Sequence, residues 1–353
     1  MLEIVKRLTS LNGPCGYEHN VSYFIRDYVK DLVDEVRIDG IGNVIAIKRG
    51  ELSGPKVLLT AHMDEVGFIV KKIEENGLLR FEKLGGHDDR ILLAQQVMVI
   101  GNSGEVHGVI GTMSAHFVKY DDPMKVRKHS HLYIDIGATS KEEAENMGIE
   151  VGSPVTWATE MKVIGPKGKE MIMAKSLDDR AGCAVLLQLL KELQNEIFVG
   201  EITFLFSVQE EVGLRGAETA IKTLEVDAAI AIDTTAVSDT PEETMDKTLF
   251  LGHGTGIKVM DFSLIVHKTM KNHLVSLAKA NGIAYQLEIF PGIGTDGGAV
   301  ALANHGVPTG VLSIPSRYAH SPIELVSVAD LEATKDLLKA FVLDLSEETS
   351  FEW

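Results

Sequence analysis

The stretch K-V-L-L-T-A-H-M-D, residues 56–64, is a largely apolar run that ends in a histidine and an aspartate. Turn residues bound it on both sides. An apolar run of this kind is typical of a strand that is buried on both faces of a sheet, because helices cover each face. We therefore predict that this segment forms a central strand of an α/β fold, with polar side chains at its carboxyl end.

Helical and strand patterns alternate along the chain on both sides of this strand. Before it come a short helix, an amphipathic helical pattern in V-S-Y-F-I-R-D-Y-V-K-D-L-V and a hairpin-like pair in V-R-I-D-G-I-G-N-V-I-A-I-K. After about residue 165 we expect helix 178–193, strand 201–208, helix 217–224, strand 227–233, helix 271–281, strand 307–314 and a helix from about 328. Sequential strand and helix units imply a mainly parallel sheet with helices on both faces. The charged tail after residue 345 is expected to be a solvated end.

The pattern changes to short strands between about residues 67 and 164. F-I-V-K-K-I-E-E-N-G-L-L-R-F-E-K-L places Asn76-Gly77 between two strand-like runs, which is a good indication of a β-hairpin. More short strands with glycine-containing turns follow, together with one short helix in K-E-E-A-E-N-M. We predict a main α/β domain of residues 1–66 and 165–353, with a small β-rich domain of residues 67–164 inserted into it.

The composition limits the classes of partner. The chain has 353 residues with 34 basic and 51 acidic side chains, and its formal net charge of −17 argues against binding to nucleic acid or to an anionic membrane. Its two cysteines, Cys15 and Cys183, indicate neither a disulfide framework nor a cysteine-based zinc site, and they fit a reducing compartment. Neither a signal peptide nor an apolar stretch of about 18 to 20 residues is found, so we expect a cytoplasmic protein.

Polar side chains follow several of the predicted strands. Ligands of an open α/β sheet bind outside the carboxyl ends of its strands, so side chains at those ends are candidates for a site. Successive side chains at a strand end point in different directions, so two neighbouring glutamates there can have separate roles. Three strand ends and two adjacent loops bring the following residues to one edge of the sheet: His62, Asp64, Asp178, Glu210, Glu211, Asp233 and His320.

Each of these residues also has an ordinary structural explanation. His62 could be a hydrogen-bonded core histidine, and Asp178 or Asp179 could cap the helix that follows. Asp233 could be a turn residue, and His320 lies in a loop with serine and proline, where a surface position is common. The set as a whole favours a site, because these residue types arrive together at one edge of one sheet.

A metal centre explains the set best. Several carboxylates in a sheltered cleft are unfavourable unless cations compensate them. Two divalent ions supply that compensation, because three ligand carboxylates and a bridging hydroxide carry about four negative charges. Imidazole and carboxylate together suit zinc or its near neighbours, and the histidines argue against calcium. Asp64 is well placed to accept the second ring N–H of His62 and so to fix its tautomer.

Six motifs follow one another in order along almost the whole chain, and five of them carry these residues: A-H-M-D-E-V-G (61–67), S-L-D-D-R-A-G (176–182), V-Q-E-E-V-G-L-R-G-A (208–217), A-I-D-T-T (231–235) and I-P-S-R-Y-A-H-S-P (314–322). The sixth is G-T-D-G-G (294–298). As a set they resemble the motifs of the TET-type dinuclear aminopeptidases. That family includes glutamyl, leucyl and deblocking aminopeptidases, and some members have been labelled cellulases or endoglucanases.

The resemblance implies a zinc-peptidase or phosphorylase-like α/β fold and a ligand set for two divalent ions. Asp178 would bridge the two ions. His62 and Asp233 would complete one site with it, and Glu211 and His320 would complete the other. The implied metals are zinc or cobalt, with manganese as a further option.

The implied reaction is metal-assisted removal of N-terminal residues from peptides that have a free amino terminus. The ions would bind that amino group and polarise the scissile carbonyl, and a bridging hydroxide would attack. Glu210 would be the general base and would pass the proton to the leaving amine, while Asp64 would orient the first histidine. The resemblance also implies that residues 67–164 are a β-barrel-like dimerisation domain, and that dimers assemble into a tetrahedral dodecamer.

Three alternatives stay open on the sequence. A related dinuclear amidohydrolase or carboxypeptidase uses a similar ligand set, although its extra domain normally enters later in the chain. A glycosidase with two carboxylates as acid and nucleophile or base needs no metal. A binding or scaffold protein with a vestigial site would bind none. Two loops, around Gly294-Thr295-Asp296 and Ser316-Arg317-Tyr318, are candidates for lining a specificity pocket.

Overall fold

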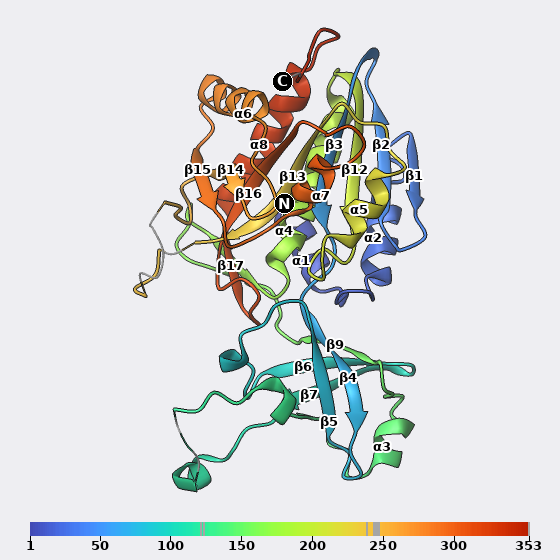
Figure 1. The fold of residues 1–353 in the computed structure, drawn as a ribbon, viewed down its shortest axis with the longest axis vertical. Coiled ribbons are helices and arrows are strands. Elements are labelled where there is room, and N and C mark those ends of the chain that lie inside the picture. Colours follow the sequence, from blue (N-terminus) through green and yellow to red (C-terminus); the bar gives the residue numbers. More distant parts are fainter. Residues whose placement is uncertain (121, 123, 238, 243–247, 352–353) are drawn as a thin grey trace.

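The computed structural model describes residues 1–353 apart from 121, 123, 238, 243–247 and 352–353, and it consists of an α/β body with a β-barrel at one end (Figure 1). The helices of the body are α1 (Leu2–Thr9), α2 (His19–Val29), α4 (Leu177–Glu192), α5 (Arg215–Ile221), α6 (Lys268–Asn281), α7 (Asp296–Ala301) and α8 (Val328–Asp344). Its strands are β1 (Glu35–Ile38), β2 (Val44–Arg49), β3 (Leu52–His62), β10 (Lys162–Ile164), β11 (Met171–Ala174), β12 (Val199–Ser207), β13 (Ala228–Ala236), β14 (Thr255–Asp261), β15 (Tyr285–Phe290), β16 (Thr309–Arg317) and β17 (Glu324–Ser327). The barrel contains β4 (Gly67–Ile73), β5 (Leu79–Leu84), β6 (Gln96–Gly101), β7 (Gly104–Ile110), β8 (Ile134–Asp135), α3 (Lys141–Asn146) and β9 (Pro154–Trp157). Within the described part of the chain, no helix has both the length and the apolar character needed to cross a membrane.

The body is built on one large sheet with a parallel centre and antiparallel edges. Its strands lie in the order β1-β2-β12-β3-β13-β16-β17-β11-β10, and β14 and β15 branch from β16. β12, β3, β13 and β16 run parallel to one another, whereas the strands at both ends of this order pair antiparallel. The expectation of a mainly parallel sheet therefore applies only to the centre. Short connections, such as the one between β1 and β2, can join only antiparallel strands, and hairpins of this kind build the edges.

Helices cover both faces of the central strands, as the apolar run in residues 56–64 predicts. Val57 and Leu59 of β3 pack into the core shared with α1, α4 and α8, whereas Leu58 packs on the opposite face against α5 and α7. Side chains alternate between the two faces along a strand, so a strand with two covered faces needs apolar residues at successive positions. This requirement places β3 in the middle of the sheet.

The barrel closes through six strands in the order β4-β5-β8-β7-β6-β9 and has a hydrophobic core of its own. Phe68 lies in this core, with its ring centroid 5.0 Å from those of both Phe81 and Trp157. The predicted Asn76-Gly77 hairpin joins β4 to β5, and Gly77 takes a φ of +83°, which favours glycine.

Phe351, the last described residue, packs back onto the body, so the expectation of a solvated tail is wrong at this position, whereas residues 346–350 before it are exposed or half-buried. Leu345 and Phe351 are buried in the main core, and the Phe351 ring stacks on Phe341 of α8 at a centroid distance of 5.9 Å. Glu347 and Glu348 between them stay exposed. Two apolar side chains are enough to anchor a segment whose overall composition is polar.

The buried carboxylate of Glu65 links the barrel to the body beside the predicted site. Glu65 is 1% exposed, and its carboxylate accepts hydrogen bonds from Lys175 Nζ (2.6 and 2.8 Å), from Thr156 Oγ1 of β9 (2.8 Å) and from the Gly13 N–H (2.9 Å). Burial raises the pKa of Glu65, but the nearby Lys175 and Arg180 outweigh this effect and hold the pKa below its ordinary value. The carboxylate is therefore ionised at neutral pH.

Glu65→Ala is expected to lower the free energy of unfolding by about 3–5 kcal/mol, because it leaves a buried ammonium without its nearest counterion. Chemical denaturation followed by circular dichroism measures this loss. Glu225→Ala is the control, since Glu225 pairs with Lys56 at the surface, where an ion pair contributes about 0–1 kcal/mol. Equal losses in the two variants would show that the buried pair has no structural role.

Candidate metal centre

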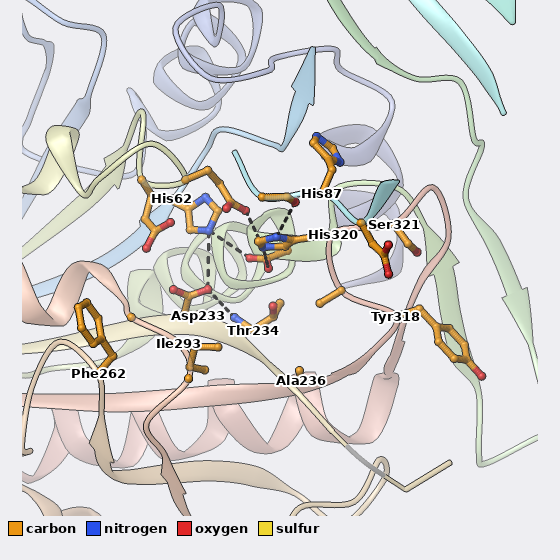
Figure 2. A pocket seen from close by; sticks show the side chains of 18 of the residues that line it. His62, His87, Asp233, Thr234, Ala236, Phe262, Ile293, Tyr318, His320 and Ser321 are labelled. Carbon is orange, nitrogen blue, oxygen red and sulfur yellow. Dashed lines mark hydrogen bonds and ion pairs between the residues drawn. The ribbon is translucent and has the colours of Figure 1, made fainter. Parts of the chain in front are cut away.

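Five of the seven predicted residues lie in or just after strands that are neighbours, whereas Asp178 begins α4 and His320 lies in the loop between β16 and β17. β12, β3 and β13 are adjacent and parallel, so their carboxyl ends lie at one edge of the sheet. A cavity of about 760 Å³ opens at this edge, and all the predicted residues except Asp64 line it. Figure 2 shows His62, Asp233 and His320 pointing toward one another, with Phe262 and Ile293 on one side of them.

Two ligand clusters share one aspartate. The first consists of His62, Asp178 and Asp233 and the second of Asp178, Glu211 and His320, and the possible ligand atoms of each cluster all lie within 4.8 Å of one another. Asp178 Oδ1 is 3.1 Å from His62 Nε2, whereas Asp178 Oδ2 is 3.3 Å from His320 Nε2. Each oxygen of one carboxylate thus faces a different cluster, which is the arrangement that a bridging ligand needs.

The second ring nitrogen of each histidine faces an oxygen. His320 Nδ1 lies 3.0 Å from the carbonyl oxygen of Gly86, in the segment that follows β5 of the barrel. His62 Nδ1 lies 3.2 Å from the backbone oxygen of Asp64 and 3.4 Å from its carboxylate Oδ1. A proton on each Nδ1 satisfies these contacts and leaves the Nε2 lone pair directed at the carboxylates.

Asp64 has a second task that the sequence does not indicate. Its side chain is fully buried, and its two oxygens accept the N–H of Glu210 (2.9 Å) and the N–H of Glu211 (3.2 Å). Burial raises the pKa of Asp64, but His62 and these two amides outweigh it and lower the pKa below its ordinary value. The ionised carboxylate therefore fixes the backbone from which both glutamates project.

The electrostatics of the cavity favour cations. Burial raises the pKa of Glu210 well above its ordinary value, and the neighbouring Asp233 and Glu211 raise it further. Burial and Asp178 likewise raise the pKa of Asp233 to about 7, although His62 opposes them. Carboxylates in this state gain from any positive charge placed among them.

The second cluster offers one place where a cation would fit. Glu211 Oε1 is buried without a hydrogen-bond donor, and it lies 3.1 Å from His320 Nε2. With the ring proton on Nδ1, two lone pairs face each other across this distance, and Asp178 Oδ2 adds a third. Nitrogen and oxygen donors in this arrangement fit a divalent ion of the zinc type.

The two aspartates at the start of α4 divide the roles that the sequence left open. Asp178 takes part in both clusters, whereas Asp179 Oδ1 accepts the Gly182 N–H at 3.0 Å, as a helix-capping side chain does. Glu210 also lies within ligand distance of His62 and Glu211 in a third cluster. Distance alone therefore does not separate a ligand from a base at Glu210.

The structure adds residues that the sequence argument missed. Glu324 accepts the backbone N–H of two predicted ligands, and it lies just beyond the motif of residues 314–322. Leu214 and Ile293 line the cavity as apolar walls, which a search for polar residues overlooks. Of the loops predicted to line a specificity pocket, Gly294 and Tyr318 do reach the cavity.

The chain matches a known family along most of its length. Residues 42–337 match the family model described as M42 glutamyl aminopeptidase. The lysyl aminopeptidase of Pyrococcus furiosus is 34% identical over 347 residues, which cover 97% of this chain and 97% of that protein. The solved structure of an aminopeptidase from the archaeon Desulfurococcus kamchatkensis is 39% identical with a TM-score of 0.92, and the match covers 98% of this chain and 95% of that one.

Two further solved structures resemble this chain, and one is described by its assembly and the other by a different enzyme name. A TET peptidase of Pyrococcus horikoshii, described as able to assemble into a tetrahedron or a large octahedral shell, is 34% identical with a TM-score of 0.87 over 98% of this chain and 99% of that one. A Thermotoga maritima protein named endoglucanase is 34% identical with a TM-score of 0.78 over 96% of both chains. These matches include the barrel as well as the body.

Proposed function

Because this chain belongs to the family of M42 glutamyl aminopeptidases, as its resemblance to the TET-type enzymes predicts, we propose that it is a metal-dependent aminopeptidase that removes N-terminal residues from peptides. The observation that carries the proposal is the shared aspartate, since Asp178 presents one oxygen to each of two histidine-containing clusters. A carboxylate that reaches both clusters could hold two ions close together, which two-metal hydrolysis requires.

Five residues would hold the ions: His62, Asp178, Glu211, Asp233 and His320. Two divalent ions, with zinc or cobalt preferred and manganese as a further option, would neutralise the carboxylates, lower the pKa of the attacking water and polarise the scissile carbonyl. The nitrogen and oxygen donors and the crowded carboxylates support this assignment.

Glu210 would act as the general base. It is the one glutamate of the pair outside the two clusters that share Asp178, and it lines the same cavity. In this position its carboxylate takes a proton from the attacking water and donates it to the amine that leaves when the peptide bond breaks. Asp64 positions Glu210 by accepting its backbone N–H.

The two parts of the chain would divide the work. Residues 1–66 and 165–353 would form the catalytic domain together with β10 (Lys162–Ile164), which pairs with β11 in the sheet of the body. The rest of residues 67–164 has its own hydrophobic core, which supports a separate domain, and we assign dimerisation to it. Dimers would assemble into a dodecamer like the tetrahedral shell of the Pyrococcus horikoshii relative. Light scattering and electron microscopy test this assembly.

The unpaired Cys15 and Cys183 support a cytoplasmic location.

A panel of chromogenic aminoacyl substrates tests the activity. The protein is stripped of metal, reconstituted with zinc, cobalt or manganese, and assayed on each substrate. We expect hydrolysis that depends on added metal and is lost with a chelator. No hydrolysis with any metal would contradict the proposal. Cellulose hydrolysis that a chelator does not affect would favour the glycosidase alternative, which needs two carboxylates and no metal.

A further inference from the structure

Glu324 joins two segments of the metal centre without being a candidate ligand itself. It is the first residue of β17 and is 1% exposed. Its Oε2 accepts the backbone N–H of Asp178 at 2.8 Å, and its Oε1 accepts the backbone N–H of His320 at 2.9 Å. Both oxygens are thus occupied by amides, and Glu324 belongs to none of the candidate ligand groups of the described residues.

The two amides belong to residues of the second cluster, and one of them belongs to the aspartate that both clusters share. Asp178 and His320 lie more than a hundred positions apart in the sequence, so only a tertiary contact can fix the distance between them. His320 also has a φ of +60°, a left-handed conformation that a non-glycine residue keeps only when its surroundings hold it. The hydrogen bond from the His320 N–H to the Glu324 carboxylate helps to keep this conformation.

We propose that Glu324 is a positioning residue that sets the spacing of Asp178 and His320, and thereby the affinity of the second cluster for its metal ion. This inference rests on the proposed function, because it requires that the two clusters bind metal. Asp64 makes the same kind of double contact with Glu210 and Glu211. In both places one buried carboxylate accepts the backbone N–H of two site residues.

Asp330 offers a matched control elsewhere in the chain. It is fully buried in α8, and its two oxygens accept the N–H of Gly252 and the N–H of Gly254, both at 2.7 Å. It therefore makes the same double contact with backbone, but it neither lines the cavity nor belongs to a candidate ligand group. Its removal should destabilise the protein without changing metal affinity.

The test is a titration of metal-stripped protein with Co²⁺, followed by calorimetry and by the visible absorption of the bound ion. Wild type is expected to bind about two ions per chain. Glu324→Ala should bind the weaker of them about 10–100-fold less tightly, with an altered spectrum. Glu324→Gln should lie in between, because it keeps one acceptor oxygen and turns an N–H₂ group toward the other amide. Asp330→Ala should keep the wild-type affinities.

Wild-type affinities in Glu324→Gln and Glu324→Ala would overturn the inference, while two bound ions in the unaltered chain would leave the proposed function standing. If metal affinity fell equally in Asp330→Ala, the inference about Glu324 would also be overturned, because the lower affinity would then follow from a general loss of stability. If Glu324→Ala does not fold, the glutamine variant decides the question by itself. Fewer than two ions in wild type would overturn the proposed function and this inference together.

Discussion

Replacing Glu210 by glutamine is expected to lower kcat about 10²- to 10⁴-fold while both metal ions stay bound. Glutamine has nearly the shape of glutamate but cannot take up a proton, so the variant removes a general base and little else. The ions should stay because neither of the clusters that share Asp178 includes Glu210. Steady-state kinetics and metal analysis by mass spectrometry, carried out on the same preparation, measure both quantities.

Glu211→Gln is the matched comparison, since the two residues are neighbours on one strand end and Asp64 holds the backbone N–H of both. Glu211 Oε1 lies 3.1 Å from His320 Nε2, so its replacement should weaken metal binding itself. The two variants should therefore differ in metal content. Equal loss of metal in both would mean that Glu210 is a ligand, as its cluster with His62 and Glu211 permits, and the division of roles would be wrong.

The sequence predicted best those features that depend on a local pattern. β3 could be predicted because its apolar residues follow one another without interruption, and both of its faces are indeed covered. Five of the seven predicted site residues lie in or just after β3, β12 and β13, which prove to be neighbours, and Asp178 of α4 and His320 of the β16–β17 loop join them. Their gathering follows from a general rule about α/β sheets, which needs no knowledge of individual contacts.

The sequence did not predict two strands that carry buried charged residues. β14 and β15 carry no clean apolar pattern, because Lys258, Asp261 and Glu288 interrupt it, and a charged residue is normally taken for a surface position. In the structure Lys258 is fully buried, 3.5 Å from Asp261 Oδ2 and 3.7 Å from Glu288 Oε1. Compensation of this kind depends on which strands become neighbours, and the pattern within one segment does not contain that information.

The sequence also did not predict the side chains that hold the backbone of the site in place, for a related reason. Arg180 lies within one of the motifs, yet its role is to donate hydrogen bonds to the carbonyl oxygens of Leu8 (2.7 Å) and Met63 (2.5 Å) from a fully buried position. Glu324 likewise contacts only backbone amides. Backbone groups are the same at every residue, so the sequence cannot show which of them a distant side chain will hold.

Asp178→Asn is expected to remove the two-metal centre rather than one ligand of it. An asparagine has one carbonyl oxygen and one N–H₂ group, so it can face only one cluster with a lone pair. We expect at most about one tightly bound ion per chain. Loss of the second ion should lower kcat on the order of 10³-fold, because metal polarisation of the substrate is worth several kcal/mol in the transition state. Metal analysis after dialysis measures the first quantity and kinetics measure the second.

Asp179→Asn separates this loss from the general effect of changing a buried aspartate. Asp179 is the adjacent residue, is fully buried and is replaced by the same isostere, but its Oδ1 accepts the Gly182 N–H, a bond that asparagine can keep. This variant should retain about two ions. If Asp178→Asn also retained two, both oxygens of Asp178 could not be needed as ligands, and the two clusters would have to be treated as separate sites. If both variants lost metal equally, the loss would follow from a disturbed fold at the start of α4. The mutations would then give no support to Asp178 as a bridging ligand.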